Sequence, residues 1–291
     1  MRNVRNRSCS GLRKAGKTAA LAAGALCGMG LFLLAPGYAS RTMKAPFQKR
    51  NFAHRGLHTK DKKVPENSLT AFELAAAAGY GIELDVHLSK DGSVVVFHDD
   101  TLERVCGVPG RVEDLTLAQL QQLKLCGSEE TIPLFTDVLN VIHGRGPLIV
   151  EIKTGSRNRE LCRKTLAILR GYAGDYCIES FDPTVVAWFR FHAPDLLRGQ
   201  LACPPEDFEA GSYKYLRYLL GSCLFNALAR PHFIAYKIGR RPLPVRISEL
   251  LGAMRVGWTS HEAANEKGRD AVIFEFYRPE RSFDRPEKTE N

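Results

Sequence analysis

The strongest constraint on the fold of this chain is a repeating pattern, in which short apolar runs alternate with amphipathic segments from residue 51 to residue 276. Runs that are apolar at nearly every position are typical of parallel strands buried on both faces of a sheet. The runs predicted as strands are Phe52–Arg55, Gly81–Val86, Leu148–Lys153, Tyr176–Phe181, Leu197–Ala202, Phe233–Ile238, Met254–Thr259 and Asp270–Phe276. Eight such strands with helices between them, in roughly 225 residues, predict a (β/α)8 TIM barrel.

An open, doubly wound sheet is the alternative architecture, but the sequence lacks the Gly-rich phosphate loop expected after its first strand. Residues 87–132 interrupt the repeat, because Asp91-Gly92 signals a hairpin and further Gly and Pro residues follow. We therefore predict a barrel over residues 51–276 with a small inserted subdomain at residues 87–132. The charged, Pro-containing tail over residues 277–291 is predicted to be disordered.

The N-terminal segment has a different composition from the rest of the chain. Residues 1–17 form a basic arm, and the uncharged run over 18–40 has an apolar part, Thr18–Pro36, long enough to cross a bilayer as a helix. A cleavable signal peptide is the alternative, because the small residues Gly37 and Ala39 fit a cleavage site. Six basic residues before the run and four after it favour a cytoplasmic N-terminus. The prediction is a single-pass transmembrane anchor in the cell membrane, with the barrel outside the cytoplasm.

The net charge of +9 is also a property of this N-terminal segment. The first 50 residues hold ten of the 41 Lys and Arg and none of the 32 Asp and Glu, which leaves 31 basic and 32 acidic residues in the rest. A near-neutral barrel lacks the electrostatic footprint of a nucleic-acid-binding domain, so nucleic acid is not expected as a partner. The eight cysteines are scattered without a metal-binding spacing, so we expect small buried side chains, with disulfides as the alternative outside the cell.

Acidic side chains lie within two of the predicted strands. Glu83 and Asp85 are two residues apart in a strand, so both point to one face, and Glu151 lies in the next barrel strand. Three carboxylates brought together repel one another, and a hard divalent cation, Mg²⁺ or Ca²⁺, relieves that repulsion. The sequence therefore predicts a metal site formed by these three residues. The alternative is an ion-pair network of the same carboxylates with Arg55 and Lys153.

Two histidines stand at comparable places in the chain. His54 and His98 each lie at the end of an apolar run and precede a charged residue. Imidazole titrates near neutral pH, so the two are natural candidates for general acid and base. Arg55 and Lys153 supply positive charge for an anion, and the Arg fork suits phosphate. A metal, two histidines and two cations together indicate phosphoryl-transfer chemistry.

An ordered set of motifs extends across the barrel. The set comprises HRG (54–56), PENS (65–68), ELD (83–85), KDG (90–92), HDDTLER (98–104) and EIK (151–153), followed by Ser180-Phe181 and Trp258-Thr259. In this order and at these spacings the motifs resemble the glycerophosphodiester phosphodiesterase family. The resemblance covers residues 51–276 and implies a TIM barrel with a small insertion after its second strand.

The resemblance also implies roles for individual residues. It implies a metal held by Glu83, Asp85 and Glu151, His54 and His98 as general acid and base, Arg55 and Lys153 as phosphate contacts, and Trp258 and Phe181 as contacts of the alcohol moiety. The chain departs from the family pattern at Ser68, where Thr is more usual, and after Trp258, where Trp-Thr-Ser-His replaces Trp-Thr-Val-Asn. The second departure concerns the pocket for the leaving alcohol.

The activity implied by the resemblance is metal-dependent hydrolysis of glycerophosphodiesters to glycerol 3-phosphate and an alcohol. One alternative keeps the site and changes the substrate to a lysophospholipid or a glycerol-phosphate polymer at the membrane. The other is a non-catalytic, membrane-tethered binding protein that has the same barrel.

Overall fold

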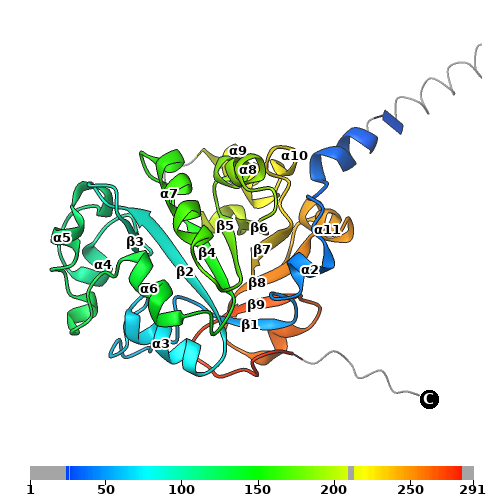
Figure 1. Cartoon of the computed structure of the whole chain (residues 1–291). Coiled ribbons are helices and arrows are strands. Elements are labelled where there is room, and N and C mark those ends of the chain that lie inside the picture. Colours follow the sequence, from blue (N-terminus) through cyan, green and yellow to red (C-terminus); the bar gives the residue numbers. More distant parts are fainter. Residues whose placement is uncertain (1–23, 26, 209–212, 284–291) are drawn as a thin grey trace, which may run out of the picture.

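The computed structural model describes residues 24, 25, 27–208 and 213–283. Its centre is a closed barrel of eight parallel strands, as the sequence predicts (Figure 1). The strands are β1 (Arg50–Ala53), β2 (Gly81–Leu88), β4 (Leu148–Ile152), β5 (Tyr176–Ser180), β6 (Arg198–Ala202), β7 (Phe233–Lys237), β8 (Met254–Ser260) and β9 (Ala271–Phe274). The sheet closes because β1 pairs with both β2 and β9.

Helices follow the strands and cover the outside of the barrel (Figure 1). They are α3 (Leu69–Ala77), α6 (Phe135–Ile142), α7 (Asn158–Arg170), α8 (Pro183–His192), α9 (Lys214–Gly221), α10 (Asn226–Ala229) and α11 (Leu243–Leu250), with short 3-10 turns η3 (Pro205–Asp207) and η4 (Ala263–Glu266). Local sequence fixes where two of them begin. Ser68 caps α3 by accepting from the Ala71 amide, and Asp182 caps α8 ahead of Pro183.

Two phenylalanine rings lie in the interior of the barrel. Phe52 of β1 and Phe233 of β7 are fully buried there. A Cβ atom added to Gly199 would lie 2.0 Å from the Phe233 ring, and one added to Gly81 would lie 2.4 Å from the Phe52 ring. These glycines are therefore needed for space, and the interior is a packed core rather than a pore. The buried carboxylates Glu83, Asp85, Glu151 and Glu179 lie closer to the carboxyl ends of the strands.

The predicted inserted subdomain is present after β2. The chain turns at Asp91-Gly92 into β3 (Val94–Val96), which pairs antiparallel with β2. The short elements α4 (Glu103–Cys106), η1 (Val112–Asp114), α5 (Leu117–Leu120) and η2 (Leu125–Gly127) follow. They enclose a separate apolar cluster that includes Phe97, Leu102 and Leu125. Because Phe97 donates its amide to the Asp85 carbonyl, 3.0 Å away, the insertion begins at the rim of the barrel.

The predicted transmembrane helix is not supported. Residues 24, 25 and 27–34 are helical, whereas residues 35–40 are not. Within the described ranges, the structure contains no helix with the length and apolar character needed to cross a bilayer. The predicted basic arm over 1–17, and residues 18–23 and 26 of the predicted span, lie outside the described residues.

The end of the predicted span is bound to the barrel instead. The Leu34 carbonyl accepts a hydrogen bond of 2.8 Å from Ser248 Oγ, and the Gly37 amide donates to the Pro231 carbonyl over 2.9 Å. Ala39 is buried in the same apolar cluster as the interior phenylalanines, and α2 (Arg41–Lys44) follows it. Since Pro231 precedes β7, this segment meets the barrel at the amino ends of its strands.

The prediction of a disordered tail is wrong for residues 277–283. Ser282 forms a bridge with Arg50 at the start of β1, and the Phe283 amide donates to the Lys49 carbonyl over 3.0 Å. Tyr80 Oη donates to the Pro279 carbonyl over 2.6 Å. After β9 the chain therefore runs along the barrel to the start of β1. Residues 284–291 of the predicted tail lie outside the described ranges.

The seven cysteines in the described part of the chain are all free. Cys162, Cys177, Cys203 and Cys223 are buried, which confirms the expectation of small apolar side chains for these four.

A buried histidine at the amino end of β7 leads to a prediction about acid stability. His232 is 2% exposed, and burial lowers its pKa to about 3, with help from the positive charge of Arg198. The unfolded chain binds a proton at His232 below its ordinary pKa of 6.5, and the folded chain does not until about 3. Stability is therefore lost as the pH falls through this window, by up to about 1.4 kcal/mol per pH unit for one such group.

His232→Gln is expected to reduce the dependence of the free energy of unfolding on pH between about 6.5 and 3. Urea titrations at several pH values measure this slope. The control is His261→Gln, since the His261 side chain is 60% exposed. Equal slopes for His232→Gln and the wild type would contradict the prediction.

Candidate active site

The loop after β1 depends on a glycine. Gly56 has φ +79°, and a Cβ atom there would lie 2.8 Å from backbone and side-chain atoms of Ala71 in α3. The Leu57 amide donates to the Ala71 carbonyl over 2.9 Å, and the Asn67 amide donates to the Arg55 carbonyl over 3.0 Å. The HRG and PENS motifs are thus joined through their backbones, and only glycine allows α3 to approach so closely.

The three predicted metal ligands converge at the carboxyl ends of β2 and β4. Asp85 and Glu151 are direct neighbours in the strand register, and one oxygen each of Glu83, Asp85 and Glu151 lies within 4.8 Å of the others. All three are buried. Asp85 Oδ1 finds no hydrogen-bond partner among the described residues. An all-oxygen donor set with an unsatisfied buried oxygen fits a hard divalent cation.

A fourth carboxylate, which our sequence reasoning missed, stands beside this group. Glu179 of β5 is the register neighbour of Glu151, is 1% exposed, and has an Oε2 atom without a hydrogen-bond partner in the described chain. Burial, and then the charges of Glu151 and Asp85, hold the pKa of Glu179 well above its usual range. The available signal was its alternation with Cys177, which places both side chains on the inner face of β5.

The two cations predicted to bind phosphate lie against the carboxylates. Lys153 Nζ is 2.9 Å from Glu151 Oε1 and 3.5 Å from Asp85 Oδ1, and Arg55 Nε is 3.5 Å from Asp85 Oδ2. The ion pairs of the alternative interpretation therefore exist. These ion pairs do not neutralise the group of carboxylates. With Glu83 and Glu179 there are four carboxylates, and only the two cations Lys153 and Arg55 face them within the described mouth of the barrel.

The ionisation of the carboxylates reflects this imbalance. Burial raises the pKa of Glu83 well above its usual range, and the negative charges of Asp85, Glu179 and Glu151 raise it further. Burial also opposes ionisation of Asp85, but His98, Lys153 and Arg55 outweigh it and hold the pKa of Asp85 well below its usual range. Protonation and a bound divalent cation are thus two ways to relieve the repulsion among these carboxylates.

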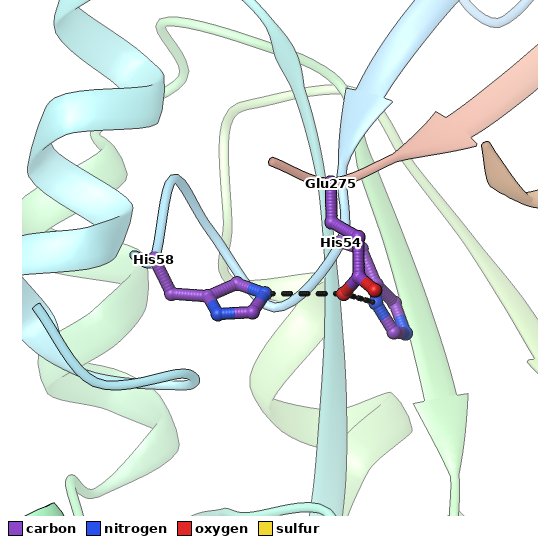
Figure 2. Close-up of side chains that lie close together, drawn as sticks. All are labelled: His54, His58 and Glu275. Carbon is purple, nitrogen blue, oxygen red and sulfur yellow. Dashed lines mark hydrogen bonds and ion pairs between the residues drawn. The ribbon is translucent and has the colours of Figure 1, made fainter. Parts of the chain in front are cut away.

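Each candidate acid–base histidine faces a carboxylate with its Nδ1 atom. His54 Nδ1 lies 2.9 Å from Glu275 Oε2, beyond the end of β9, and His98 Nδ1 lies 2.5 Å from Asp99 Oδ1 (Figure 2 for His54). An ionised carboxylate only accepts hydrogen bonds, so Nδ1 carries the proton and Nε2 is left for a substrate. Burial lowers the pKa of His54 to about 4, and the Arg55 charge contributes, so this imidazole is neutral at pH 7.

A network of ion pairs connects Asp99, the partner of His98, with Arg55, and the sequence did not predict it. Arg104 from α4 contacts Asp99 with its Nε atom at 2.6 Å and Glu66 with its Nη2 atom at 2.7 Å. Glu66 Oε1 in turn lies 2.7 Å from Arg55 Nη1. Burial opposes ionisation of Glu66, but the two arginines lower its pKa to about 2. The partner of His98 is thereby fixed relative to Arg55.

A cavity of about 440 Å³ opens beside Glu275 at the carboxyl ends of β7 and β8. Its lining consists of Lys237, Ile238, Trp258, Thr259, His261, Glu262, Asn265 and Glu275. Trp258, which the sequence predicts as a substrate contact, lines this cavity, and its Nε1 donates to the Ala235 carbonyl over 3.0 Å. Phe181 does not line the cavity; its ring packs edge-on against the Trp258 ring at 5.6 Å.

Known proteins are similar to this chain in sequence and in architecture. The model of the Glycerophosphoryl diester phosphodiesterase family matches residues 54–207. A glycerophosphodiester phosphodiesterase from Caldanaerobacter subterraneus subsp. tengcongensis is 42% identical over 113 residues, which are 35% of this chain and 44% of that protein. A lysophospholipase D from Rattus norvegicus is 30% identical over 159 residues, 50% of this chain and 49% of that protein. The matched segments thus span less than half of these relatives.

The barrel is similar to solved structures over a larger share of the chain. An Oleispira antarctica phosphodiesterase in complex with the product sn-glycerol-3-phosphate has a TM-score of 0.64 at 23% identity, covering 79% of this chain and 94% of that one. This identity supports the fold alone. The family model covers more than half of the 291 residues. The chain therefore belongs to the glycerophosphoryl diester phosphodiesterase family.

Proposed function

We propose that this protein hydrolyses glycerophosphodiesters to glycerol 3-phosphate and an alcohol, with Mg²⁺ or Ca²⁺ bound by Glu83, Asp85 and Glu151. The observation that carries the proposal is the position of this carboxylate group. It lies at the same barrel end as Arg55, Lys153 and two histidines that each have a carboxylate partner. The family of the chain supports the same reaction.

The mechanism assigns a task to each of these side chains. Arg55 and Lys153 orient the phosphate and offset its charge. One of the pair His54 and His98 accepts a proton at Nε2 from the attacking hydroxyl, which belongs to water or to the substrate's own glycerol. The other donates a proton to the departing alcohol oxygen, so that one P–O bond forms as another breaks. If the glycerol hydroxyl attacks, the product is a cyclic glycerol phosphate, which water then opens in a second step to give glycerol 3-phosphate. When bound, the divalent cation supplies Lewis-acid stabilisation of the phosphate oxygens.

Trp258 provides the wall on the leaving-alcohol side of this proposed site. Its indole lines the cavity and is held between the Ala235 carbonyl and the edge of Phe181. Phe181 then acts on the substrate through Trp258 rather than by touching it. This assignment places the variable part of the substrate in the cavity beside β7 and β8.

We also propose that the apolar N-terminal run tethers the barrel to the cell membrane, with the barrel on the extracytoplasmic side. The support is the excess of basic residues before the run. Residues 34–37 join the barrel at the amino ends of its strands, opposite the catalytic end. A tethered site would face away from the bilayer, which favours a water-soluble diester over a lysophospholipid. Release of the full chain from membranes by alkaline carbonate would contradict the tether.

Comparison of two substrates tests the proposed function. Purified protein is incubated with glycerophosphocholine or lysophosphatidylcholine, in EDTA, Mg²⁺ or Ca²⁺, and release of choline is measured. We expect metal-dependent turnover of glycerophosphocholine to exceed that of the lysolipid. Preference for the lysolipid would support the second candidate, a lysophospholipase D-type activity, for which the relative from Rattus norvegicus is named. Metal binding with no turnover of either substrate would favour a glycerol-phosphate polymer as the substrate or a non-catalytic binding protein.

A further inference from the structure

A second group of potential metal ligands lies beside the proposed catalytic centre. His54, His58 and Glu275 each offer one donor atom, and these three atoms lie within 4.8 Å of one another. Figure 2 shows both imidazoles directed at the same carboxylate from opposite sides. The residues come from the end of β1, the loop that follows it, and the segment after β9. This group contains nitrogen donors, whereas the group at Glu83 offers oxygen alone.

The Nε2 atom of His58 is buried without a hydrogen bond from the described part of the chain. Its side chain is only 8% exposed, and its Nε2 atom lies 3.3 Å from Glu275 Oε2. The Nε2 atom nevertheless finds no hydrogen-bond partner in the residues that the structure describes. The ring is held edge-on by Phe276, with ring centroids 4.8 Å apart. An oriented, buried and unsatisfied nitrogen that points at a carboxylate is suited to a ligand that both can share.

The donor set selects the type of cation. Two imidazole nitrogens and one carboxylate suit Zn²⁺ and similar transition metals, whereas Mg²⁺ and Ca²⁺ prefer oxygen. Metal–ligand bonds of about 2.0–2.2 Å in a tetrahedral site place donor atoms roughly 3.3–3.6 Å apart. The observed separations are 2.9 Å for His54 Nδ1 to Glu275 and 3.3 Å for His58 Nε2 to Glu275. Small side-chain adjustments would therefore complete such a site.

We propose that His54, His58 and Glu275 bind a Zn²⁺-type transition metal, and that this metal inhibits the enzyme by occupying Nδ1 of His54. The cation takes the place of the proton between His54 Nδ1 and Glu275, and this proton moves by way of solvent to Nε2, so that the ring stays neutral. A neutral imidazole has a single free lone pair, so a ring ligated through Nδ1 carries its one proton on Nε2. His54 can then neither accept a proton from a nucleophile nor become the imidazolium that a general acid requires. The inhibitory consequence rests on the proposed function; the binding does not.

The site is accessible to an ion in solution. Glu275 lines the 440 Å³ cavity, and the side chains of His54 and Glu275 are 14% and 17% exposed. His261 also lines this cavity, and its Nε2 atom lies 3.8 Å from Glu275 Oε1. Because the His261 side chain is 60% exposed, it serves as a neighbouring histidine that is not needed for the three-residue site.

Cobalt provides a test that does not depend on turnover. Co²⁺ in a four- or five-coordinate site with nitrogen ligands absorbs visible light much more strongly than six-coordinate Co²⁺ bound by oxygen. The protein is first saturated with Mg²⁺ and then titrated with Co²⁺, and the absorption is followed. For the wild type we expect a strong band that Zn²⁺ abolishes. For His58→Ala we expect Co²⁺ to bind more weakly by at least roughly tenfold to hundredfold, the loss typical of damaged metal sites. His58→Gln repeats the test, and His261→Gln is the control that keeps the band.

Activity with Mg²⁺ supplies the second half of the test. Micromolar Zn²⁺ is expected to inhibit the wild type and His261→Gln, while His58→Ala stays active at the same concentration. The same band in wild type and both His58 variants would overturn the proposal. Equal inhibition of wild type and His58→Ala would overturn the inhibitory role. A chain that is inactive toward diesters but keeps the His58-dependent band would contradict the proposed function and leave the metal site supported.

Discussion

Replacement of His54 or of His98 by alanine is expected to lower kcat by about 10²–10⁴-fold, the range typical of a lost general acid or base. The physical reason is the arrangement of each ring: Nδ1 faces a carboxylate at 2.9 Å or 2.5 Å, and Nε2 is left for proton transfer. The KM is expected to change much less, because Arg55 and Lys153 continue to bind the phosphate. Steady-state kinetics with glycerophosphocholine measures both constants.

The two histidine variants need a control for folding and for unrelated histidines. His192→Gln alters an exposed ring at the end of α8, whose Nδ1 lies 2.8 Å from the Trp188 carbonyl. It is expected to keep the wild-type kcat. Thermal unfolding of all three variants checks that the barrel is intact. A folded His54→Ala or His98→Ala enzyme with nearly normal kcat would refute its assignment as acid or base.

Replacement of Glu83 by glutamine is expected to abolish both metal-dependent activity and metal-dependent stabilisation. A cation that binds only the folded protein stabilises it by about 2.7 kcal/mol at a concentration one hundred times its Kd. The wild type should therefore unfold at a higher temperature in Mg²⁺ or Ca²⁺ than in EDTA, and Glu83→Gln should show little difference. Thermal unfolding in the two conditions measures this shift without any assumption about substrate.

The same variant is expected to be at least as stable as the wild type without metal. The wild-type Glu83 carboxylate is buried among Asp85, Glu151 and Glu179, which raises its pKa. A carboxyl whose pKa is raised in the folded state destabilises the protein as the pH rises above the ordinary pKa of that carboxyl, because the unfolded chain then ionises more readily. Glutamine removes this penalty. Metal-dependent stabilisation of Glu83→Gln equal to that of the wild type would contradict the metal site.

The barrel and the carboxylate group were predictable because both follow from periodicity. Eight apolar runs specify eight buried strands, and the two-residue spacing of Glu83 and Asp85 places them on one face. The strand register then brings Glu151 beside Asp85. The inserted subdomain was predictable from the Asp91-Gly92 turn, which starts the antiparallel pair of β2 and β3.

The contacts between loops were not predictable from periodicity. Arg104 reaches Glu66 across the gap between the insertion and the PENS loop, residues 38 positions apart in the chain. Glu275 meets His54 across 221 positions. Such pairs depend on how irregular segments pack, which no local pattern encodes. Glu275 and His58 lie near strand ends in the sequence, but only the closed barrel places them around one point.

The segments before and after the barrel show another limit of prediction from composition. An apolar run can cross a membrane or pack against a protein surface, and residues 34–39 do the latter at the amino ends of the strands. Likewise, a charged and Pro-containing sequence predicts disorder, but residues 277–283 pair with the start of β1. In both cases the partner surface comes from elsewhere in the chain and decides the outcome.

The most direct test of the central claim is phosphorus NMR of the products from glycerophosphocholine. The enzyme is stripped of metal with EDTA and measured before and after reloading with Mg²⁺ or Ca²⁺. The proposed site predicts glycerol 3-phosphate as the phosphorus-containing product, formed only after reloading, either directly or through a cyclic glycerol phosphate. Phosphocholine as the product, or the same rate in EDTA, would contradict it.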